Sequence, residues 1–308
     1  MSTLGTMERS DPGRPALPGA AVEDVGSMHH FRIGSYSRSD IEQLAAAFAA
    51  AQPFPHIVIP DVLRAPPEEI LPHFPTLESP LWRRLAETYQ PRKMTLSSID
   101  HIPAPLDGML RELMEPAALD FLERVSGIGR LLPDPYLDGG GLHCSRPGGA
   151  MAPHTDVHIN HRLGLYKRVN ILVYLNPGWE EADGGCLELF DERDVHTPAR
   201  TVVPRWGTMV IFRSDSHSVH GFTKPVAANG RARRSLALYY YTAAAAPEFA
   251  GNELTHWRRH EGYWARDTAS YVVRRARLGM YRALRLGAKT LAYLAHRAEP
   301  RTDWTRRP

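Results

Sequence analysis

The chain has 308 residues, of which 43% are hydrophobic and 23% charged, and its net charge is +3 at pH 7. These values are typical of a soluble globular protein that is long enough to bury one large core. No apolar run approaches the length of a membrane span, so no transmembrane helix is expected. Residues 265–308 hold eleven Lys or Arg and three Asp or Glu, which concentrates the basic character at one end of the chain.

Cys144 and Cys186 are the only two cysteines. They are too few for a disulfide framework, and the sequence leaves open whether they are free thiols or form one bridge. The N-terminus lacks the charged and then apolar pattern of a secretion signal. We therefore expect a cytoplasmic protein, while the sequence leaves the oligomeric state open.

Residues 1–37 mix Pro, Gly, Ser and charges of both signs without periodicity, which predicts a disordered leader. Residues 38–250 are expected to form one domain that begins with helices. The first helix is predicted after Ser39 and Asp40, which are candidate N-caps, and its run of helix-forming residues ends before Pro53.

Further elements are predicted before the centre of the chain. Residues 56–59 are β-branched and bounded by prolines, which indicates an edge strand, and residues 66–74 begin a second helix. Apolar residues recur at helical spacing over 106–125, with Pro116 as a break or kink. We expect these helices to pack along one side of a sheet.

After Asp138 the sequence changes to short β-type runs separated by turn residues. Eight strands at this spacing favour a mainly β fold with flanking helices, and a double-stranded β-helix, or jelly roll, fits the count. Its core is expected over residues 134–242. The predicted strands are 141–146, 150–156, 168–176, 186–190, 200–204, 208–212, 218–222 and 233–242.

Residues 251–308 are predicted to form a basic helical C-terminal extension. Within it, 268–298 shows helical periodicity with a narrow apolar stripe and an Arg-rich opposite face. A cationic stripe of this kind is most often the solvated face of a helix packed on its own domain. We therefore expect no nucleic-acid partner and no membrane span, and the alternative is a basic anchor for anionic lipid or nucleic acid.

His154 and Asp156 are candidate ligands of one metal ion. His154 and Asp156 point the same way in an extended strand, because side chains alternate between faces. Two imidazoles and one carboxylate on one side of an ion form the facial arrangement of non-heme Fe(II) oxygenases. His220 is the expected third ligand, with His217 as its competitor on the opposite face of the same segment. Other nearby histidines are interpreted as cleft-lining or solvent-facing, namely His143, His158 and His161.

Further motifs follow His154 and Asp156 in a fixed order along the chain. The motifs are HTD at 154–156, YLN at 174–176, GG at 184–185, PRWG at 204–207, HG at 220–221 and RRS at 233–235. With this ordered set, residues 134–242 resemble the 2-oxoglutarate and Fe(II) dependent dioxygenases, specifically the prolyl 4-hydroxylase-like group. The upstream segment PFPHIVIPDVL resembles the strand and helix that open the domain in that group.

The resemblance assigns the iron ligands as His154, Asp156 and His220. It implies Fe(II), with 2-oxoglutarate and O2 as co-substrates, and also L-ascorbate. The far carboxylate of 2-oxoglutarate is expected on Arg233, whose planar fork suits a carboxylate. The other expected contacts of the co-substrate are Ser235, Tyr174 and Asn170.

Two alternatives to Arg233 are Arg231 and Arg234, and Arg234 is expected on the opposite strand face. Cys144 occupies a position where relatives often have a tyrosine, which predicts different contacts to the co-substrate. Asp156 fills the third protein position that related halogenases leave open, so hydroxylation is favoured over halogenation.

The resemblance therefore implies a dioxygenase that hydroxylates a C–H bond, with a prolyl-type group in a peptide, a protein or a free amino acid as the leading substrate. The first alternative is a hydroxylase of a small biosynthetic metabolite. The second is a catalytically silent jelly-roll binding module, against which the complete set of His154, Asp156, His220 and Arg233 argues. The expected partner is thus a small molecule or a peptide.

Overall fold

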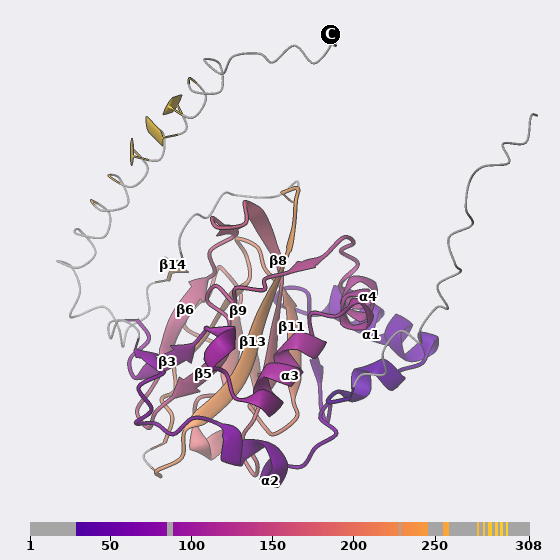
Figure 1. The fold of residues 1–308 in the computed structure, drawn as a ribbon, viewed down its shortest axis with the longest axis vertical. Helices are drawn as coiled ribbons and strands as arrows, with labels where there is room; N and C mark the ends of the chain where they lie inside the picture. The colour runs from indigo at the N-terminus through magenta and orange to yellow at the C-terminus, as the bar shows by residue number, and fades with distance from the viewer. Residues whose placement is uncertain are drawn as a thin grey trace, which may run out of the picture.

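Two antiparallel sheets, with helices against the outer face of the larger one, make up the described part of the chain (Figure 1). The computed structural model describes residues 29–84, 89–227, 229–245 and 255–258, and nine single residues between Ala276 and Leu294. The predicted mainly β architecture with flanking helices is confirmed, and the two sheets are the layers of the expected jelly roll.

The larger sheet holds most of the strands. Its order is β1 (His56–Ile59), β11 (Met209–Arg213), β8 (Leu165–Tyr174), β13 (Arg233–Thr242), β5 (Gly141–Ser145), β3 (Lys93–Leu96) and β2 (Arg83–Arg84). Two short strands join it, β4 (Leu132–Pro133) against β13 and β7 (Ile159–Asn160) against β8. As predicted, β1 is an edge strand.

The smaller sheet carries much of the candidate site. Its order is β10 (Arg200–Val202), β9 (Leu187–Phe190), β12 (Val219–Phe222), β6 (Met151–Thr155) and β14 (His256–Trp257). All eight predicted strands are thus present in the two sheets. The strands that were not predicted are β2, β3, β4, β7 and β14, each of only two to four residues.

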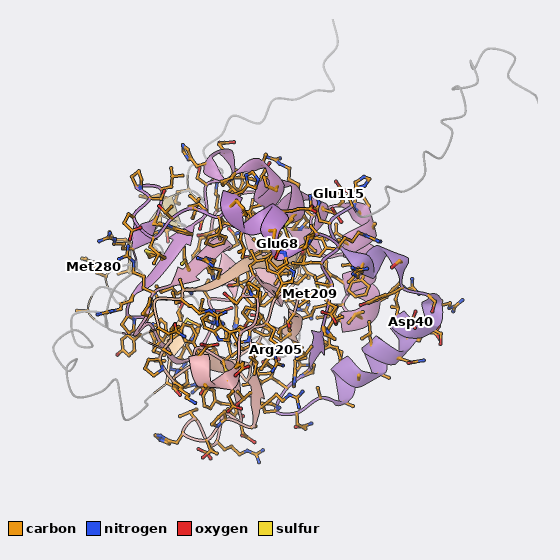
Figure 2. The ribbon with its side chains drawn as sticks, turned by 90° about the horizontal axis from the view of Figure 1, so that it is seen from below. Asp40, Glu68, Glu115, Arg205, Met209 and Met280 are labelled. Atoms are coloured by element: carbon orange, nitrogen blue, oxygen red, sulfur yellow. The ribbon has the colours of Figure 1, made fainter. Side chains whose placement is uncertain are left out.

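The helices cover one face of the larger sheet. They are α1 (Arg38–Ala50), α2 (Pro67–Ile70), α3 (Ala104–Glu112) and α4 (Pro116–Ser126), with short 3-10 turns at Arg32–Ser35, Leu71–His73, Ile99–His101 and Glu181–Asp183. Figure 1 shows α1, α3 and α4 on the side of β11 and β13 that lies away from β6 and β9. Figure 2 shows Asp40 on the outer side of α1, whereas Met209 of β11 is buried.

Proline and polar caps set the helix ends. The predicted helical run over 106–125 is divided, with α3 ending at Glu112 and α4 beginning at Pro116, because proline fits the first turn and not the interior of a helix. The N-cap of α1 is Ser37, which forms a capping box with Asp40, so the cap lies two residues before the predicted Ser39.

Alternation along β8 separates two environments. Val169, Ile171 and Val173 lie in the core under the helices, whereas Asn170 and Tyr174 face the smaller sheet. The pairing of β8 with β13 shifts by one residue between Val169 and Lys167. This bulge turns Lys167 to the face of Asn170, although the parity of the strand alone would place it on the other face.

At the N-terminal end the structure corrects the predicted disordered leader, and at the C-terminal end it describes only part of the predicted extension. Residues 29–37 belong to the predicted disordered leader, yet Phe31 and Ile33 are buried and Phe31 bridges to Leu63. Residues 1–28 and most of 251–308 lie outside the described residues, so the predicted basic extension is largely untested. Within it, His256 and Trp257 form β14, whereas the described residues from Ala276 to Leu294 are helical and exposed, including Met280, Leu284 and Leu291 of the expected apolar stripe. Among the described residues, no helix is long and apolar enough to cross a membrane.

Candidate functional site

The two candidate histidine ligands lie directly opposite each other on neighbouring strands. His154 of β6 pairs in register with His220 of β12, and the pairing shifts immediately after His220. Gly221 permits this close approach, because a Cβ atom there would lie 2.8 Å from the carbonyl oxygen of Met151. The HG sequence therefore has a steric reason: the glycine lets β12 approach β6.

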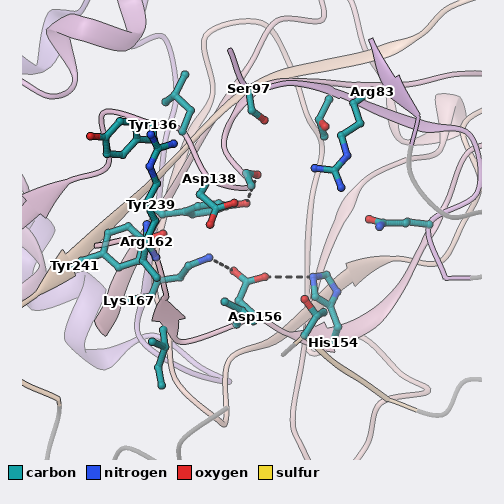
Figure 3. A pocket seen from close by; sticks show the side chains of 18 of the residues that line it. Arg83, Ser97, Tyr136, Asp138, His154, Asp156, Arg162, Lys167, Tyr239 and Tyr241 are labelled. Atoms are coloured by element: carbon teal, nitrogen blue, oxygen red, sulfur yellow. Dashed lines mark hydrogen bonds and ion pairs between the residues drawn. The ribbon is translucent and has the colours of Figure 1, made fainter. Parts of the chain in front are cut away.

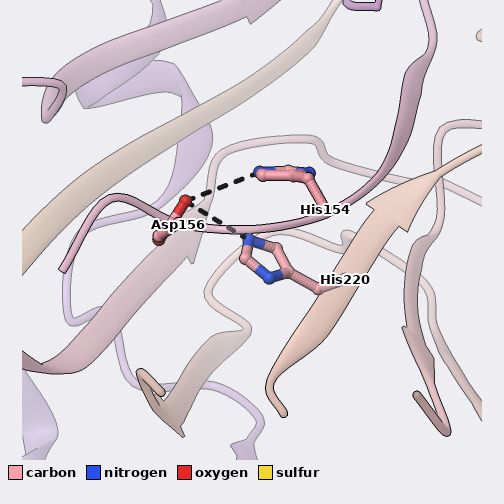
Figure 4. Close-up of side chains that lie close together, drawn as sticks. All are labelled: His154, Asp156 and His220. Carbon is pink, nitrogen blue, oxygen red and sulfur yellow. Dashed lines mark ion pairs between the residues drawn. The ribbon is translucent and has the colours of Figure 1, made fainter. Parts of the chain in front are cut away.

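His154, Asp156 and His220 form a cluster that could hold a metal ion, with ligand atoms all within 4.8 Å of one another (Figure 4). Asp156 Oδ1 lies 3.5 Å from Nε2 of His154 and 4.0 Å from Nε2 of His220. Both imidazoles are buried, with the ring of Trp257 4.6 Å from His154 and that of Phe212 4.8 Å from His220. The three ligand atoms therefore converge on one point, with an aromatic ring packed against each imidazole.

Backbone carbonyls fix the orientation of both imidazoles. Nδ1 of His154 is 3.0 Å from the carbonyl oxygen of Ala152, and Nδ1 of His220 is 3.0 Å from that of Ser218. A carbonyl oxygen only accepts hydrogen bonds, so each Nδ1 carries the proton and donates it. Each Nε2 therefore presents its lone pair toward Asp156, as a metal ligand must.

The second oxygen of Asp156 is held from the larger sheet. Oδ2 accepts a hydrogen bond of 2.6 Å from Nδ2 of Asn170. It also lies 3.4 Å from Nζ of Lys167 (Figure 3). In the structure the amide NH2 of Asn170 is bound to Asp156, and the contact of Asn170 with the co-substrate stays a prediction. Oδ1 is left to face the two imidazoles.

The electrostatic environment holds the cluster in its ligand form. Burial would raise the pKa of Asp156, but Lys167 and the two histidines together lower that pKa well below its usual value. Burial, with His154 as the second cause, lowers the pKa of His220 to about 4. At neutral pH the site therefore offers one carboxylate and a neutral His220.

A small inner cavity joins the cluster to Arg233, which is buried at the start of β13. Nε of Arg233 donates to the carbonyl oxygen of Gly185 at 2.6 Å, and Nη2 donates to the hydroxyl of Tyr174 at 3.1 Å. A guanidinium has five N–H donors, so three remain for a ligand. The positive φ of Gly185 and its lack of a Cβ allow this contact, since a Cβ would lie 3.0 Å from Cδ of Arg233.

Two buried polar atoms on the walls of this cavity have no hydrogen-bond partner among the described residues. They are Oγ of Ser235 and Oδ1 of Asn170. Buried polar atoms are seldom left unpaired, so these two indicate a missing polar ligand. Arg233 and the hydroxyls of Ser235 and Tyr174 can donate to the carboxylates of a dicarboxylate that reaches from the cluster to Arg233, whereas Oδ1 of Asn170 only accepts and needs a donor such as water.

The alternative residues have other partners. His217 is exposed, and its Nδ1 lies 2.7 Å from Glu192. Arg231 pairs with Asp183 at 3.1 Å, and Arg234 lies over the ring of Phe74 on the opposite face of β13. Among these candidates, the structure thus brings His220 and Arg233 to the site.

Position 144 requires a correction. Cys144 was expected to alter contacts with the co-substrate, but it is buried in the core beneath the helices, and burial raises the pKa of its thiol to about 11. Its neighbour His143 faces the cavity instead, and Nε2 of His143 lies 2.9 Å from the carbonyl oxygen of Gly139. Cys144 and Cys186 are both free thiols.

Several residues at the site were not predicted from the sequence. Lys167 reaches Asp156 because of the bulge in β8, and its ammonium lies 3.4 Å above the ring of Tyr239. Lys93 comes from β3, a short strand that was not predicted from the sequence. Neither lysine lies within a recognisable motif. Each reaches the site through the pairing of its strand with another strand, which the local sequence does not show.

A second cavity of about 530 Å³ opens onto the cluster from outside (Figure 3). It shares His154, Asp156, Lys93 and Tyr239 with the inner cavity. Its walls also carry Tyr136, Asp138, Arg162 and Arg83. A molecule in this outer cleft would lie next to the face of the cluster that the inner cavity leaves open.

Comparisons with known proteins converge on one family. Residues 140–241 match the sequence model of the 2OG-Fe(II) oxygenase superfamily. The chain is 28% identical over 126 residues to the prolyl 3-hydroxylase OGFOD1 of Xenopus laevis, and 32% identical over 146 residues to the prolyl 3,4-dihydroxylase OGFOD1 of Ostreococcus tauri. These matches cover 40% and 43% of this chain but 23% and 26% of the relatives, so the chain spans about a quarter of their length.

A solved prolyl-4-hydroxylase from Pseudomonas putida is also similar, with 18% sequence identity and a TM-score of 0.45. The similarity covers 66% of this chain and 100% of that one.

Proposed function

We propose that this chain, whose residues 140–241 belong to the 2OG-Fe(II) oxygenase superfamily, is a hydroxylase that binds Fe(II) through His154, Asp156 and His220. Arg233 then binds the far carboxylate of 2-oxoglutarate. The observation that carries the proposal is the single inner cavity that joins the three converging ligand atoms to an arginine with free donors. A binding module without catalysis has no need for both halves of this arrangement.

When bound, the iron supplies the oxidising chemistry by which O2 and 2-oxoglutarate convert a substrate C–H into C–OH, with succinate and CO2 as products. The chain provides geometry and exclusion of water. Asn170 and Lys167 fix one oxygen of Asp156, so the other stays directed at the iron position. Apolar side chains of the cavity, including Leu172, Phe212 and Phe222, keep it dry.

The residue pattern favours hydroxylation, because Asp156 occupies the coordination position that a halide would need. A prolyl-type group is the leading substrate, since the curated relatives are named as prolyl hydroxylases. The outer cleft beside the cluster would hold that group, in a peptide, a protein or a free amino acid.

The test combines metal binding with product formation. Wild-type protein incubated with Fe(II), 2-oxoglutarate, ascorbate and candidate prolyl substrates is expected to form succinate and to add one oxygen atom to a substrate. Asp156→Ala is expected to abolish both products and to weaken Fe(II) binding in anaerobic calorimetry, because a charged ligand is lost. The matched control is Asp120→Ala, an exposed carboxylate on α4, which should match wild type. Wild-type succinate formation by Asp156→Ala would refute the proposal.

A further inference from the structure

The outer cleft has a cationic wall on the strands that were not predicted. Lys93 and Thr95 are two residues apart on β3, and Thr95 lies directly opposite Arg83 of β2. Residues two apart in a strand and residues directly opposite in an antiparallel pair share a face. Arg83, Thr95 and Lys93 therefore line the outer cleft together, whereas Met94 is buried in the core on the other face.

No carboxylate among the described residues lies at ion-pair distance from Arg83 or Lys93. Nζ of Lys93 has the thioether sulfur of Met151 at 3.6 Å as its hydrogen-bond acceptor, which is a weak one. Arg162 on the opposite wall likewise lacks a carboxylate partner and lies over the ring of Tyr136 at 3.3 Å (Figure 3). Within the described part of the chain, the cleft thus holds three cations, Arg83, Lys93 and Arg162, that form no ion pair with a carboxylate.

The acids of the cleft do not neutralise these cations. Asp156 belongs to the ligand cluster and is already paired with Lys167. Asp138 is the one other carboxylate among the described lining residues. Burial and the nearby Arg233 and Lys167 lower the pKa of Lys93 to about 8, against the opposing effect of Asp156. The ammonium of Lys93 is thus held near other cations, an arrangement that an incoming anion would relieve.

An isolated surface arginine is usually a solvated charge, and Arg83 alone would carry no inference. Three features separate this wall from that case: the shared face of Arg83 and Lys93, the position of both beside the ligand cluster, and the missing carboxylates. We propose that Arg83 and Lys93 bind an anionic group of the substrate, a carboxylate or a phosphate, and so determine which molecules the enzyme accepts. This inference rests on the proposed function, because it assigns the outer cleft to the substrate.

The experiment measures binding rather than turnover. Protein loaded with Fe(II) and 2-oxoglutarate under anaerobic conditions is titrated with probe pairs that differ in charge, and binding is followed by calorimetry or ligand-observed NMR. N-acetyl-L-proline is compared with N-acetyl-L-prolinamide, and glucose 6-phosphate with glucose. The first pair reports a carboxylate preference and the second a phosphate preference.

The variants are Arg83→Gln and Lys93→Met, which remove each charge at similar side-chain length. The matched control is Arg84→Gln, because Arg84 neighbours Arg83 on β2 but points to the opposite face. Wild-type protein and Arg84→Gln are expected to bind the acid of at least one pair about tenfold or more tightly than its neutral partner. Each of the two cleft variants is expected to lose most of that preference while keeping the affinity for the neutral probe.

Three outcomes would overturn the inference. The first is a wild-type protein that binds neither acid more tightly than its neutral partner. The second is a preference that survives in both cleft variants, and the third is one lost equally in Arg84→Gln. If Lys93→Met instead loses affinity for 2-oxoglutarate, Lys93 binds the co-substrate. That result would overturn the assignment of Lys93 to the anionic group of the substrate.

Failure of the proposed function has a different signature. In that case the wild-type protein would not bind Fe(II) and 2-oxoglutarate or form succinate, whatever its response to the probe pairs. Normal loading with no anion preference would reject the cationic wall alone.

Discussion

At the scale of single residues, each candidate ligand side chain uses one polar atom for a hydrogen bond to the protein and leaves the other directed at the metal position. Asp156 keeps Oδ1 for the ligand cluster because Asn170 and Lys167 occupy Oδ2. The imidazoles divide in the same way, since backbone carbonyls take Nδ1 and leave Nε2. Such outer partners fix both orientation and protonation of a ligand before metal arrives.

Arg233 gives the first prediction at this scale. Arg233→Leu removes the donors at the far end of the inner cavity, so 2-oxoglutarate would bring a carboxylate there without a partner. We expect its binding to weaken by about 2–5 kcal/mol, with Fe(II) binding retained. Calorimetry on anaerobic protein measures both affinities. Arg231→Leu is the matched control, because its guanidinium is bound to Asp183 outside the cavity, and a larger loss in that variant would contradict the assignment.

Lys93 gives a prediction about stability. The folded state holds its pKa at about 8, below the ordinary 10.5, so the folded protein binds this proton less readily than the unfolded chain. The resulting penalty is fully present below pH 8 and fades as the pH rises from 8 to 10.5. Lys93→Met should therefore stabilise the protein at pH 7, and the gain should shrink toward pH 10.

Chemical unfolding at pH 7 and pH 10 measures this difference. The charged groups that set the pKa of Lys93 are Arg233 and Lys167, which lower it, and Asp156, which raises it. Lys224→Met, at an exposed lysine, is the control and should show no comparable gain. A Lys93→Met protein less stable than wild type at pH 7 would show that the ammonium is satisfied in the folded state.

At the scale of elements, the approach of β6 to β12 determines whether the two histidines converge. Gly221→Ala would place a Cβ 2.8 Å from the carbonyl oxygen of Met151, within the ladder that pairs His154 with His220. The strands must separate, which costs about 1–3 kcal/mol of stability and spreads the ligand atoms. We expect weaker Fe(II) binding together with a lower unfolding midpoint.

A glycine with space around it is the control for this prediction. At Gly129 the nearest atom to an added Cβ is a side-chain oxygen of Glu123 at 3.9 Å, so Gly129→Ala should leave Fe(II) binding unchanged. Unaltered Fe(II) affinity in Gly221→Ala, measured by anaerobic calorimetry, would show that the close approach is not required.

The β8 bulge marks what sequence reasoning at the element scale could not reach. Strict alternation was enough to place Asn170, Tyr174, Arg233 and Ser235 on the face toward the smaller sheet. It could not place Lys167, because one extra residue in β8 reverses the parity beyond Val169. The bulge depends on the partner strand β13, so the local sequence carries no sign of it.

At the scale of the whole molecule, the features that were predicted are those determined by residues close together in the sequence. Features that depend on contacts between distant residues were missed. The HTD and HG motifs each place candidate ligands within a few residues. The eight core strands were predicted from short β-type runs bounded by turn residues. The cationic wall was missed because β2 and β3 are four residues long or shorter, and because β3 gains its place from pairing with β5 and β2 from pairing with β3. The ordered residues 29–37 were missed because a partner on α3 holds them.

That partner is Glu112, and it gives the last prediction. Its buried carboxylate accepts hydrogen bonds from the backbone N–H groups of His30 and Phe31 and lies 2.6 Å from Nδ1 of His30. Glu112→Ala leaves these groups without their acceptor beside the core, which costs about 2–4 kcal/mol of unfolding free energy. The control is Glu42→Ala, whose exposed pair with Arg38 is worth at most about 0.5 kcal/mol. Denaturant unfolding measures both, and equal losses in the two variants would show that Glu112 does not hold this segment.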